Sequence, residues 1–146
     1  MAQATAATNR PGFDLHPQLA SDAVPVCDLP LSRVLASRDA TYPWLILVPR
    51  RAGISEIIDL DEADRATLMR EIADVSHVLK GVTACDKLNV AAIGNMVPQL
   101  HVHVVARRRG DPAWPRPVWG AGPPSGYEAD ALERFVAAVR SDLGFA

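Results

Sequence analysis

The segment from Gln99 to Arg107 constrains the fold of this chain more than any other. Side chains of an extended strand point alternately to its two faces. One face of this segment would be uniformly apolar: Leu100, Val102, Val104 and Ala106. The other face would carry Gln99, His101, His103 and Val105. The alternation therefore predicts a strand that packs one face into a core and presents two imidazoles and an amide on the other.

Short apolar runs between proline and glycine residues predict the remaining strands. The run Pro43–Pro49 encloses Trp-Leu-Ile-Leu-Val between two prolines, which is typical of a buried strand. The other predicted strands are Val24–Leu29, Ser32–Arg38 and Leu88–Asn95. Together with the histidine-containing segment, these runs predict a sheet of five strands.

Asp61–Lys80 is the clearest helix of the sequence, with Asp61 as its expected N-cap. Apolar residues at spacings of four, three and four line one of its faces: Leu68, Ile72, Val75 and Leu79. Shorter patterns predict helices at Asp14–Asp22 and Glu128–Leu143. Strands and helices with short connections indicate an α+β fold with a mainly antiparallel sheet.

The chain has 146 residues, enough for one domain with its own core. Residues 1–12 open on an Ala-, Thr- and Gln-rich stretch that predicts a disordered tail, so the single domain is expected at residues 13–146. A net charge of −2 gives no general electrostatic basis for binding nucleic acid or an anionic membrane. No apolar run approaches the roughly 18–20 residues that span a bilayer.

Two features bear on the cellular compartment. The N-terminal stretch lacks the apolar core of a signal peptide. Cys27 and Cys85 belong to no CxxC pair, and two cysteines do not make a disulfide framework. We therefore expect two thiols in a reducing cytosol and a cytoplasmic protein.

The polar side chains at Gln99, His101 and His103 have a chemical use. Residues two apart on a strand are about 7 Å apart, which can span a phosphate group and its ester oxygens. A neutral imidazole nitrogen is a competent nucleophile toward phosphorus, and a neighbouring imidazole or amide can donate to phosphate oxygens. Two other interpretations fit the same residues: half-buried histidines with a structural role, and a His-x-His pair of metal ligands.

The segment resembles the motif of the histidine-triad (HIT) superfamily, His-φ-His-φ-His-φ-φ with apolar φ. The corresponding residues run from Gln99 to Val105, so Gln99 replaces the first histidine while His101 and His103 match the second and third. The order of the flanking segments is also similar. It runs through Leu47-Val48-Pro49-Arg50, the long helix, Asn89 and the Gly94-Asn95 turn. The resemblance covers roughly residues 24–107.

The resemblance implies a HIT-like fold, a mainly antiparallel five-stranded sheet with a long helix and a C-terminal helix. It also implies that His101 attacks the α-phosphate of a nucleotide and forms a nucleotidyl-histidine intermediate. The chain would then be a hydrolase or transferase that acts on nucleotide esters, anhydrides or phosphoramidates. This chemistry requires no metal or other cofactor.

The same resemblance suggests roles for five further residues. His103 and Gln99 would bind and orient the phosphate, Gln99 through amide hydrogen bonds. Asn89 and Asn95 stand where the family has polar phosphate contacts, and Asp39 is a candidate for the ribose hydroxyls. Many family members pair into homodimers with a continuous sheet, so we expect a nucleotide or nucleotide conjugate and a second copy of the chain as partners.

Two departures from the family leave other functions open. Gln99 cannot shuttle a proton, and Met96 stands where many members have a serine near the leaving group. A nucleotide-binding module with little turnover is therefore an alternative to the enzyme. A metal-binding protein that uses His101 and His103 as ligands is another.

Three further features have a structural interpretation and a functional one. Arg107-Arg108-Arg109 is expected to be a solvated strand end, although it could attract a polyphosphate. The Pro- and Trp-rich segment Asp111–Gly120 is expected to lie ordered against the body and could cover the mouth of the site. Trp44 is expected in the core, with a role near the base pocket as the alternative.

Overall fold

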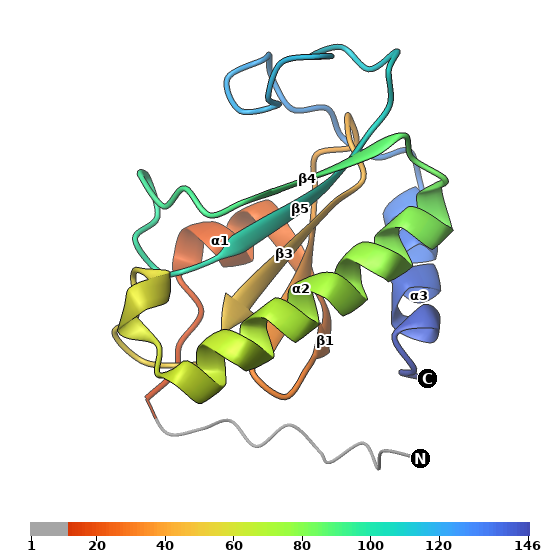
Figure 1. Cartoon of the computed structure of the whole chain (residues 1–146). Helices are drawn as coiled ribbons and strands as arrows, with labels where there is room; N and C mark the ends of the chain where they lie inside the picture. Colours follow the sequence, from red (N-terminus) through yellow and green to blue (C-terminus); the bar gives the residue numbers. More distant parts are fainter. Residues whose placement is uncertain (1–11) are drawn as a thin grey trace.

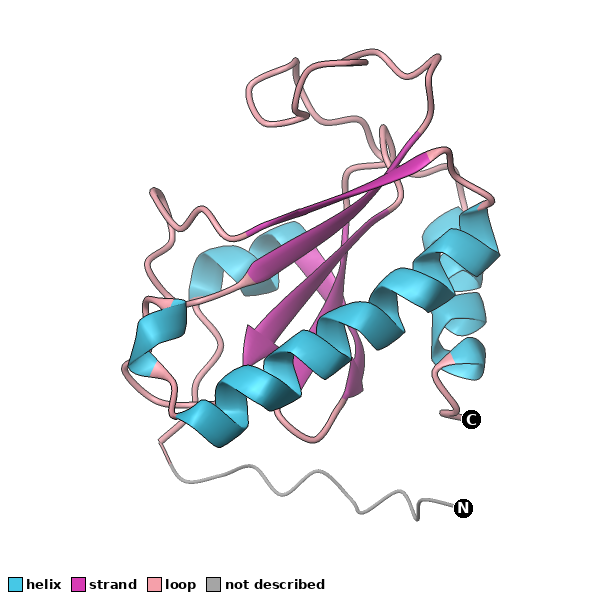
Figure 2. Cartoon of the chain, in the orientation of Figure 1, coloured by secondary structure: helices cyan, strands magenta, loops and turns pink. Residues whose placement is uncertain are grey.

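The computed structural model describes residues 12–146, so most of the predicted tail at residues 1–12 lies outside the described residues. The strands form one antiparallel sheet in the order β1-β2-β3-β5-β4 (Figures 1 and 2). They are β1 (Ala23–Asp28), β2 (Ser32–Ser37), β3 (Trp44–Pro49), β4 (Lys87–Ala91) and β5 (Val102–Arg107). The predicted α+β class and five-stranded sheet are confirmed.

Helices cover the two faces of the sheet unequally. The long helix α2 (Glu62–Thr83) and the C-terminal helix α3 (Ala131–Asp142) lie on one face, and the short α1 (Pro17–Asp22) lies on the other (Figure 1). Alternate residues of β2 and β3 divide between the two cores, because strand side chains alternate in direction. Val34 and Leu47 belong to the α2 side, whereas Leu35 and Ile46 belong to the α1 side.

The helix α2 follows the sequence prediction closely. Asp61 caps its N-terminus by accepting a hydrogen bond from the Asp64 amide at 2.8 Å. Three of the four predicted apolar positions are fully buried and the fourth is half-buried: Leu68, Val75, Leu79 and Ile72. The helix ends at Thr83 rather than Lys80, with Ala84 in the left-handed conformation as C-cap. Within residues 12–146, no helix is long and apolar enough to cross a membrane.

The predicted strands on either side of the β4–β5 connection are too long. β4 ends at Ala91 and β5 begins only at Val102, so residues 92–101 form an irregular loop. Gly94 adopts a φ of +72° in this loop, a conformation that side chains with a Cβ rarely take. Gln99 and His101 therefore lie before the strand, whereas His103 lies within it.

The two cysteines, Cys27 and Cys85, are free and buried. Burial raises the pKa of the Cys27 thiol to about 11. A thiol with such a pKa is protonated at neutral pH and is a poor nucleophile. The cytoplasmic location stays a prediction.

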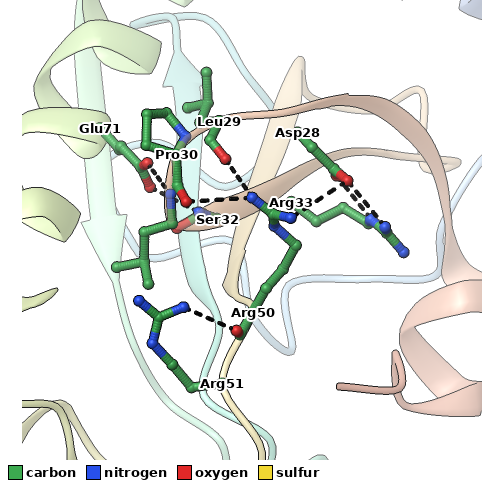
Figure 3. A network of polar contacts seen from close by, with 9 residues as sticks. Asp28, Leu29, Pro30, Ser32, Arg33, Arg50, Arg51 and Glu71 are labelled. Carbon is green, nitrogen blue, oxygen red and sulfur yellow. Dashed lines mark hydrogen bonds and ion pairs between the residues drawn. The ribbon is translucent and has the colours of Figure 1, made fainter. Parts of the chain in front are cut away.

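A buried polar network joins α2 to the turn between β1 and β2 (Figure 3). The Glu71 carboxyl accepts hydrogen bonds from the Leu31 amide at 2.7 Å and the Ser32 amide at 3.0 Å. Arg50, at the end of β3, donates to the carbonyl of Leu29 at 2.6 Å. Burial raises the pKa of Glu71, and the two amides partly offset that effect. The network satisfies turn groups that would otherwise be buried without partners.

Replacing Glu71 should destabilise the fold. Glu71→Ala leaves two buried amides without an acceptor, and we expect the free energy of unfolding to fall by about 3 kcal/mol. Urea denaturation followed by circular dichroism measures the change. Asp74→Ala is the matched control, because Asp74 is an exposed acid on the same helix. Equal losses of stability from the two substitutions would contradict the stabilising role of the Glu71 hydrogen bonds.

Candidate active site

His101 lies immediately before β5 and is 7% exposed. Its Nδ1 is 2.7 Å from the backbone carbonyl oxygen of Gln99. Because a carbonyl oxygen only accepts hydrogen bonds, Nδ1 carries the proton and donates. In the neutral form of the ring, the lone pair is then on Nε2. An imidazole in this tautomer has an unprotonated nitrogen available for nucleophilic attack.

His103 has the opposite tautomer. It lies within β5, is 8% exposed, and its Nδ1 accepts a hydrogen bond from the indole Nε1–H of Trp44 at 3.0 Å. Its Nε2 therefore carries the proton. Burial, with a smaller contribution from His101, lowers the pKa of His103 to about 4. At neutral pH His103 is an uncharged hydrogen-bond donor.

Two tryptophans enclose the His103 ring. The ring centroids of His101 and His103 are 4.8 Å apart, and their planes meet at 76°. Trp44 and Trp119 contact His103 edge-on, with centroid distances of 5.5 Å and 5.3 Å. The indoles limit the access of water to His103, which explains its low pKa.

The two histidines line a cavity of about 640 Å³, a volume in the range of small-molecule sites. Its floor is apolar and includes Leu19, Ile46 and Val97. Polar groups stand around this floor: Ser21, Asp22, Ser37, Arg38, Asp39, Asn95 and Ser125. The cavity thus has an apolar surface for a flat ring and polar groups for a more hydrophilic part of a ligand.

Gln99 contributes to this site through its backbone. Its side-chain Nε2 donates to the carbonyl of Asp14 at 2.8 Å, and its Oε1 accepts from the amide of His16 at 2.9 Å. The Gln99 side chain is not among the residues that line the cavity. The expected row of three polar side chains is absent here, because Gln99 precedes the strand and its amide binds the segment before α1.

Asn89 also lies away from the cavity. It pairs with Val105 in the sheet, two residues along β5 from His103. Its Oδ1 accepts a hydrogen bond from Arg107 at 2.7 Å, and it is not among the lining residues. The order of the residues in the sequence could not reveal that the Asn89 side chain binds Arg107 instead of a ligand.

Arg107 is not the solvated strand end that the sequence suggested. Its side chain is 1% exposed and pairs with Asp111 through two hydrogen bonds of 2.7 Å and 3.0 Å. It also donates to the carbonyl of Arg116 at 2.9 Å. Arg108 and Arg109 are exposed, as expected of a strand end. Arg107 therefore fixes the start of the loop that follows β5.

That loop lies over one end of the sheet (Figure 2). Its residues form part of the cavity wall. It carries Trp119, Pro124 and Ser125, all of which line the cavity. The Asp39 carboxylate accepts hydrogen bonds from the amides of Thr41 at 2.9 Å and Ser125 at 3.0 Å. The bond from Ser125 joins the loop directly to Asp39, the predicted ribose-binding residue. Asp39 and Asn95 both line the cavity.

The site residues missed by the sequence analysis include Trp119. Its only signal was the density of proline and tryptophan in residues 111–120, which predicted an ordered loop without naming the residue it contacts. Trp44 packs half-buried against the core, as expected, and it also lines the cavity, where the alternative interpretation placed it. Within residues 12–146, no group of three histidine, cysteine or carboxylate side chains could hold a metal ion.

The chain belongs to the HIT domain family, whose model matches residues 18–110. This match contains β1 to β5, the cavity histidines and the whole of α2. The HIT-like fold predicted from the motif is therefore confirmed.

Solved structures agree with this assignment. A histidine triad protein from Bradyrhizobium japonicum is 56% identical and superposes with a TM-score of 0.89, covering 91% of this chain and 99% of that one. A histidine triad protein from Marinobacter aquaeolei is 43% identical, with a TM-score of 0.87 over 90% of this chain and 96% of that one. One from Sinorhizobium meliloti is 42% identical, with a TM-score of 0.87 over 89% and 96%. A comparison with curated proteins gave no match.

The low pKa of His103 predicts a pH dependence of stability. Between its ordinary pKa of 6.5 and about 4, the unfolded chain binds a proton at this residue and the folded chain does not. The free energy of unfolding is therefore unaffected by the titration of this residue above pH 6.5. It decreases as the pH falls from 6.5 to about 4, by on the order of 3 kcal/mol. Urea denaturation from pH 7 to pH 4 measures it. His103→Gln should show a shallower decline, and identical slopes for the two proteins would contradict the prediction.

Proposed function

We propose that this protein is a nucleotide hydrolase or transferase whose nucleophile is Nε2 of His101. The observation that carries the proposal is the hydrogen bond from His101 Nδ1 to the Gln99 carbonyl, which assigns the lone pair of the neutral ring to Nε2 beside the cavity that His101 lines. Membership in the HIT family supports a nucleotide as the ligand. The substrate would be a nucleotide ester, anhydride or phosphoramidate.

In the first step, Nε2 of His101 forms a bond to the α-phosphorus while the bond to the leaving group breaks. The leaving group departs with the bonding electron pair and takes a proton from water. The His101 ring then carries a positive charge, which strengthens its hydrogen bond to the Gln99 carbonyl. A preorganised acceptor for that charge lowers the energy of the transition state. Water then forms a bond to phosphorus as the phosphorus–nitrogen bond breaks. The electron pair returns to Nε2 of His101, the water gives a proton to solvent, and the nucleotide is released.

His103 is suited to hold the phosphate during both steps. Its neutral ring presents Nε2–H as a donor, and the ring lies 4.8 Å from that of His101, centroid to centroid. A neutral donor binds a phosphate oxygen without taking up a proton at working pH. Asn95 is a second candidate for phosphate contact because it lines the same cavity.

Asp39 remains the candidate for the ribose hydroxyls. Its Oδ1 accepts hydrogen bonds from the amides of Thr41 and Ser125. Neither bond uses Oδ2, which can therefore accept a hydrogen bond from a ligand. A carboxylate oxygen at the cavity wall can accept from a ribose hydroxyl. The bond to Ser125 would couple ribose binding to the position of the loop after β5.

The replacement of the first motif histidine by Gln99 raises the alternative of a binding module with little turnover. The structure of the site favours the enzyme, because any residue at position 99 supplies the same backbone carbonyl to His101. The Gln99 side chain instead joins the loop before β5 to the segment before α1.

The His101 assignment is tested with adenosine and guanosine 5′-phosphoramidates and phosphate anhydrides as substrates. His101→Ala should lower kcat by about a thousandfold or more, because no other nucleophile replaces the imidazole. His77→Ala, at an exposed histidine on α2, is the matched control and should keep wild-type turnover. Gln99→Ala should lose less than about tenfold. Turnover that survives in His101→Ala would sink the proposal, and nucleotide binding without turnover in wild type would support the binding module.

We also propose that two copies pair through β4. Both β1 and β4 are edge strands of the described sheet, but Pro25 and a register shift beside it interrupt β1. Proline and irregular register protect an edge strand from pairing. β4 contains no proline and exposes Val90, 48% accessible. Pairing of two β4 strands would extend the sheet across the dimer.

Introducing a charge on β4 should separate the copies. Val90→Lys is expected to halve the mass measured by size-exclusion chromatography with light scattering, because a buried unpaired charge opposes association. Ala137→Lys adds the same charge to an exposed position on α3 and should leave the mass unchanged. A wild-type protein that is already monomeric at micromolar concentration would overturn the pairing.

A further inference from the structure

We propose that Trp44 is a positioning residue that holds His103 in the Nε2–H tautomer, so that this ring donates a hydrogen bond to the substrate phosphate. The inference rests on the proposed function for the identity of the ligand. It assigns to Trp44 an effect on the reaction that is exerted entirely through His103.

The donor and acceptor chemistry of the contact fixes the tautomer. An indole Nε1–H can only donate, so the His103 Nδ1 that lies 3.0 Å away must offer a lone pair. In a neutral imidazole the other nitrogen then carries the hydrogen. The opposite tautomer would turn Nδ1–H toward the indole N–H and present a lone pair to a phosphate oxygen. By excluding an Nδ1–H, Trp44 also excludes the tautomer that would present a lone pair to the phosphate.

The sheet places the indole where it can act. Ile46 is the direct partner of His103 in the register of β3 and β5, and Trp44 is the partner of Val105. Trp44 is therefore diagonal to His103 on the same face, within reach of a long aromatic side chain. Both side chains line the cavity, so the hydrogen bond lies at the border of the substrate site.

Trp119 provides an internal comparison. It contacts the same imidazole edge-on at 5.3 Å, close to the 5.5 Å of Trp44. Its buried Nε1 has no hydrogen-bond partner among the described residues. The two tryptophans thus share the packing contact with His103, but only Trp44 selects the tautomer.

The protonation of His103 supports the same role. Its pKa of about 4 keeps the ring neutral at working pH, so the ring cannot attract phosphate through a positive charge. A neutral ring binds phosphate only through the nitrogen that carries hydrogen. The choice of tautomer therefore determines whether His103 binds or repels a phosphate oxygen.

The first experiment records the nitrogen resonances of ¹⁵N-histidine-labelled protein at pH 7, with His103→Gln used to assign the His103 signals. Imidazole nitrogen shifts distinguish protonated from unprotonated nitrogens. Wild type is expected to show protonated Nε2 and unprotonated Nδ1 at His103. Trp44→Phe should populate both tautomers, whereas Trp119→Phe should keep the wild-type pattern. An unchanged His103 tautomer in Trp44→Phe would overturn the inference.

A direct measurement on wild type covers the case in which Trp44→Phe does not fold. With tryptophan and histidine both labelled, a scalar coupling across the hydrogen bond should connect Trp44 Nε1 to His103 Nδ1. A His103 ring protonated at Nδ1 in the wild type would overturn the inference without any variant.

The second experiment measures kcat and KM on the nucleotide panel. Trp44→Phe should lower kcat/KM by about tenfold, the effect of disorganising one hydrogen bond. Trp44→His should recover most of this loss, because imidazole Nε2 can take the ring position of indole Nε1 and carry a hydrogen. Equal losses in Trp44→Phe and Trp44→His would indicate a packing role and overturn the inference. A third outcome separates the two proposals. If wild type has no turnover but shows the expected His103 tautomer, and Trp44→Phe loses it, the proposed function is refuted while the role of Trp44 in selecting the tautomer is supported.

Discussion

The hydrogen bond between His101 Nδ1 and the Gln99 carbonyl is the interaction on which the chemistry of this site depends. It decides which nitrogen of the neutral imidazole keeps a lone pair, and in the proposed mechanism it provides an acceptor for the charge that develops on the ring. Because the acceptor belongs to the backbone, the loop before β5 must hold its conformation. The two hydrogen bonds of the Gln99 side chain tie this loop to the segment before α1.

The cavity histidines form a pair of complementary tautomers. The Gln99 carbonyl accepts a hydrogen bond from Nδ1–H of His101, whereas the Trp44 indole donates one to Nδ1 of His103, so the proton of that ring lies on Nε2. Both selections are made by neutral groups in a water-poor site, so neither ring needs a charged partner. A carboxylate beside His103 would have raised its pKa and produced an imidazolium instead. The tryptophans therefore define the electrostatics of the site as well as its shape.

Burial explains why some predicted site residues lie elsewhere. Arg107 is fully enclosed and uses Asp111, Asn89 and a loop carbonyl to satisfy its guanidinium. A buried guanidinium without such partners would be costly, so Asn89 is held away from the cavity. Gln99 was predicted as a strand residue, but the turn at Gly94 and the late start of β5 leave it in a loop. Local alternation could not detect either constraint, because it does not report which groups a side chain binds: Arg107 binds Asp111 and Asn89, and the Gln99 side chain binds the segment before α1.

The sequence alone determined the elements that depend on local periodicity: the five strands, the capped helix α2 and the apolar face of β5. It also singled out His101 and His103, through their two-residue spacing and their match to the HIT motif, and both line the cavity. Only the tertiary structure decided the tautomers, the burial of Arg107 and the cavity walls supplied by Trp44 and Trp119. The physical reason is that a hydrogen-bond partner or a shielding ring can come from any part of the chain. Its identity is therefore set when the sheet and the loop after β5 come together.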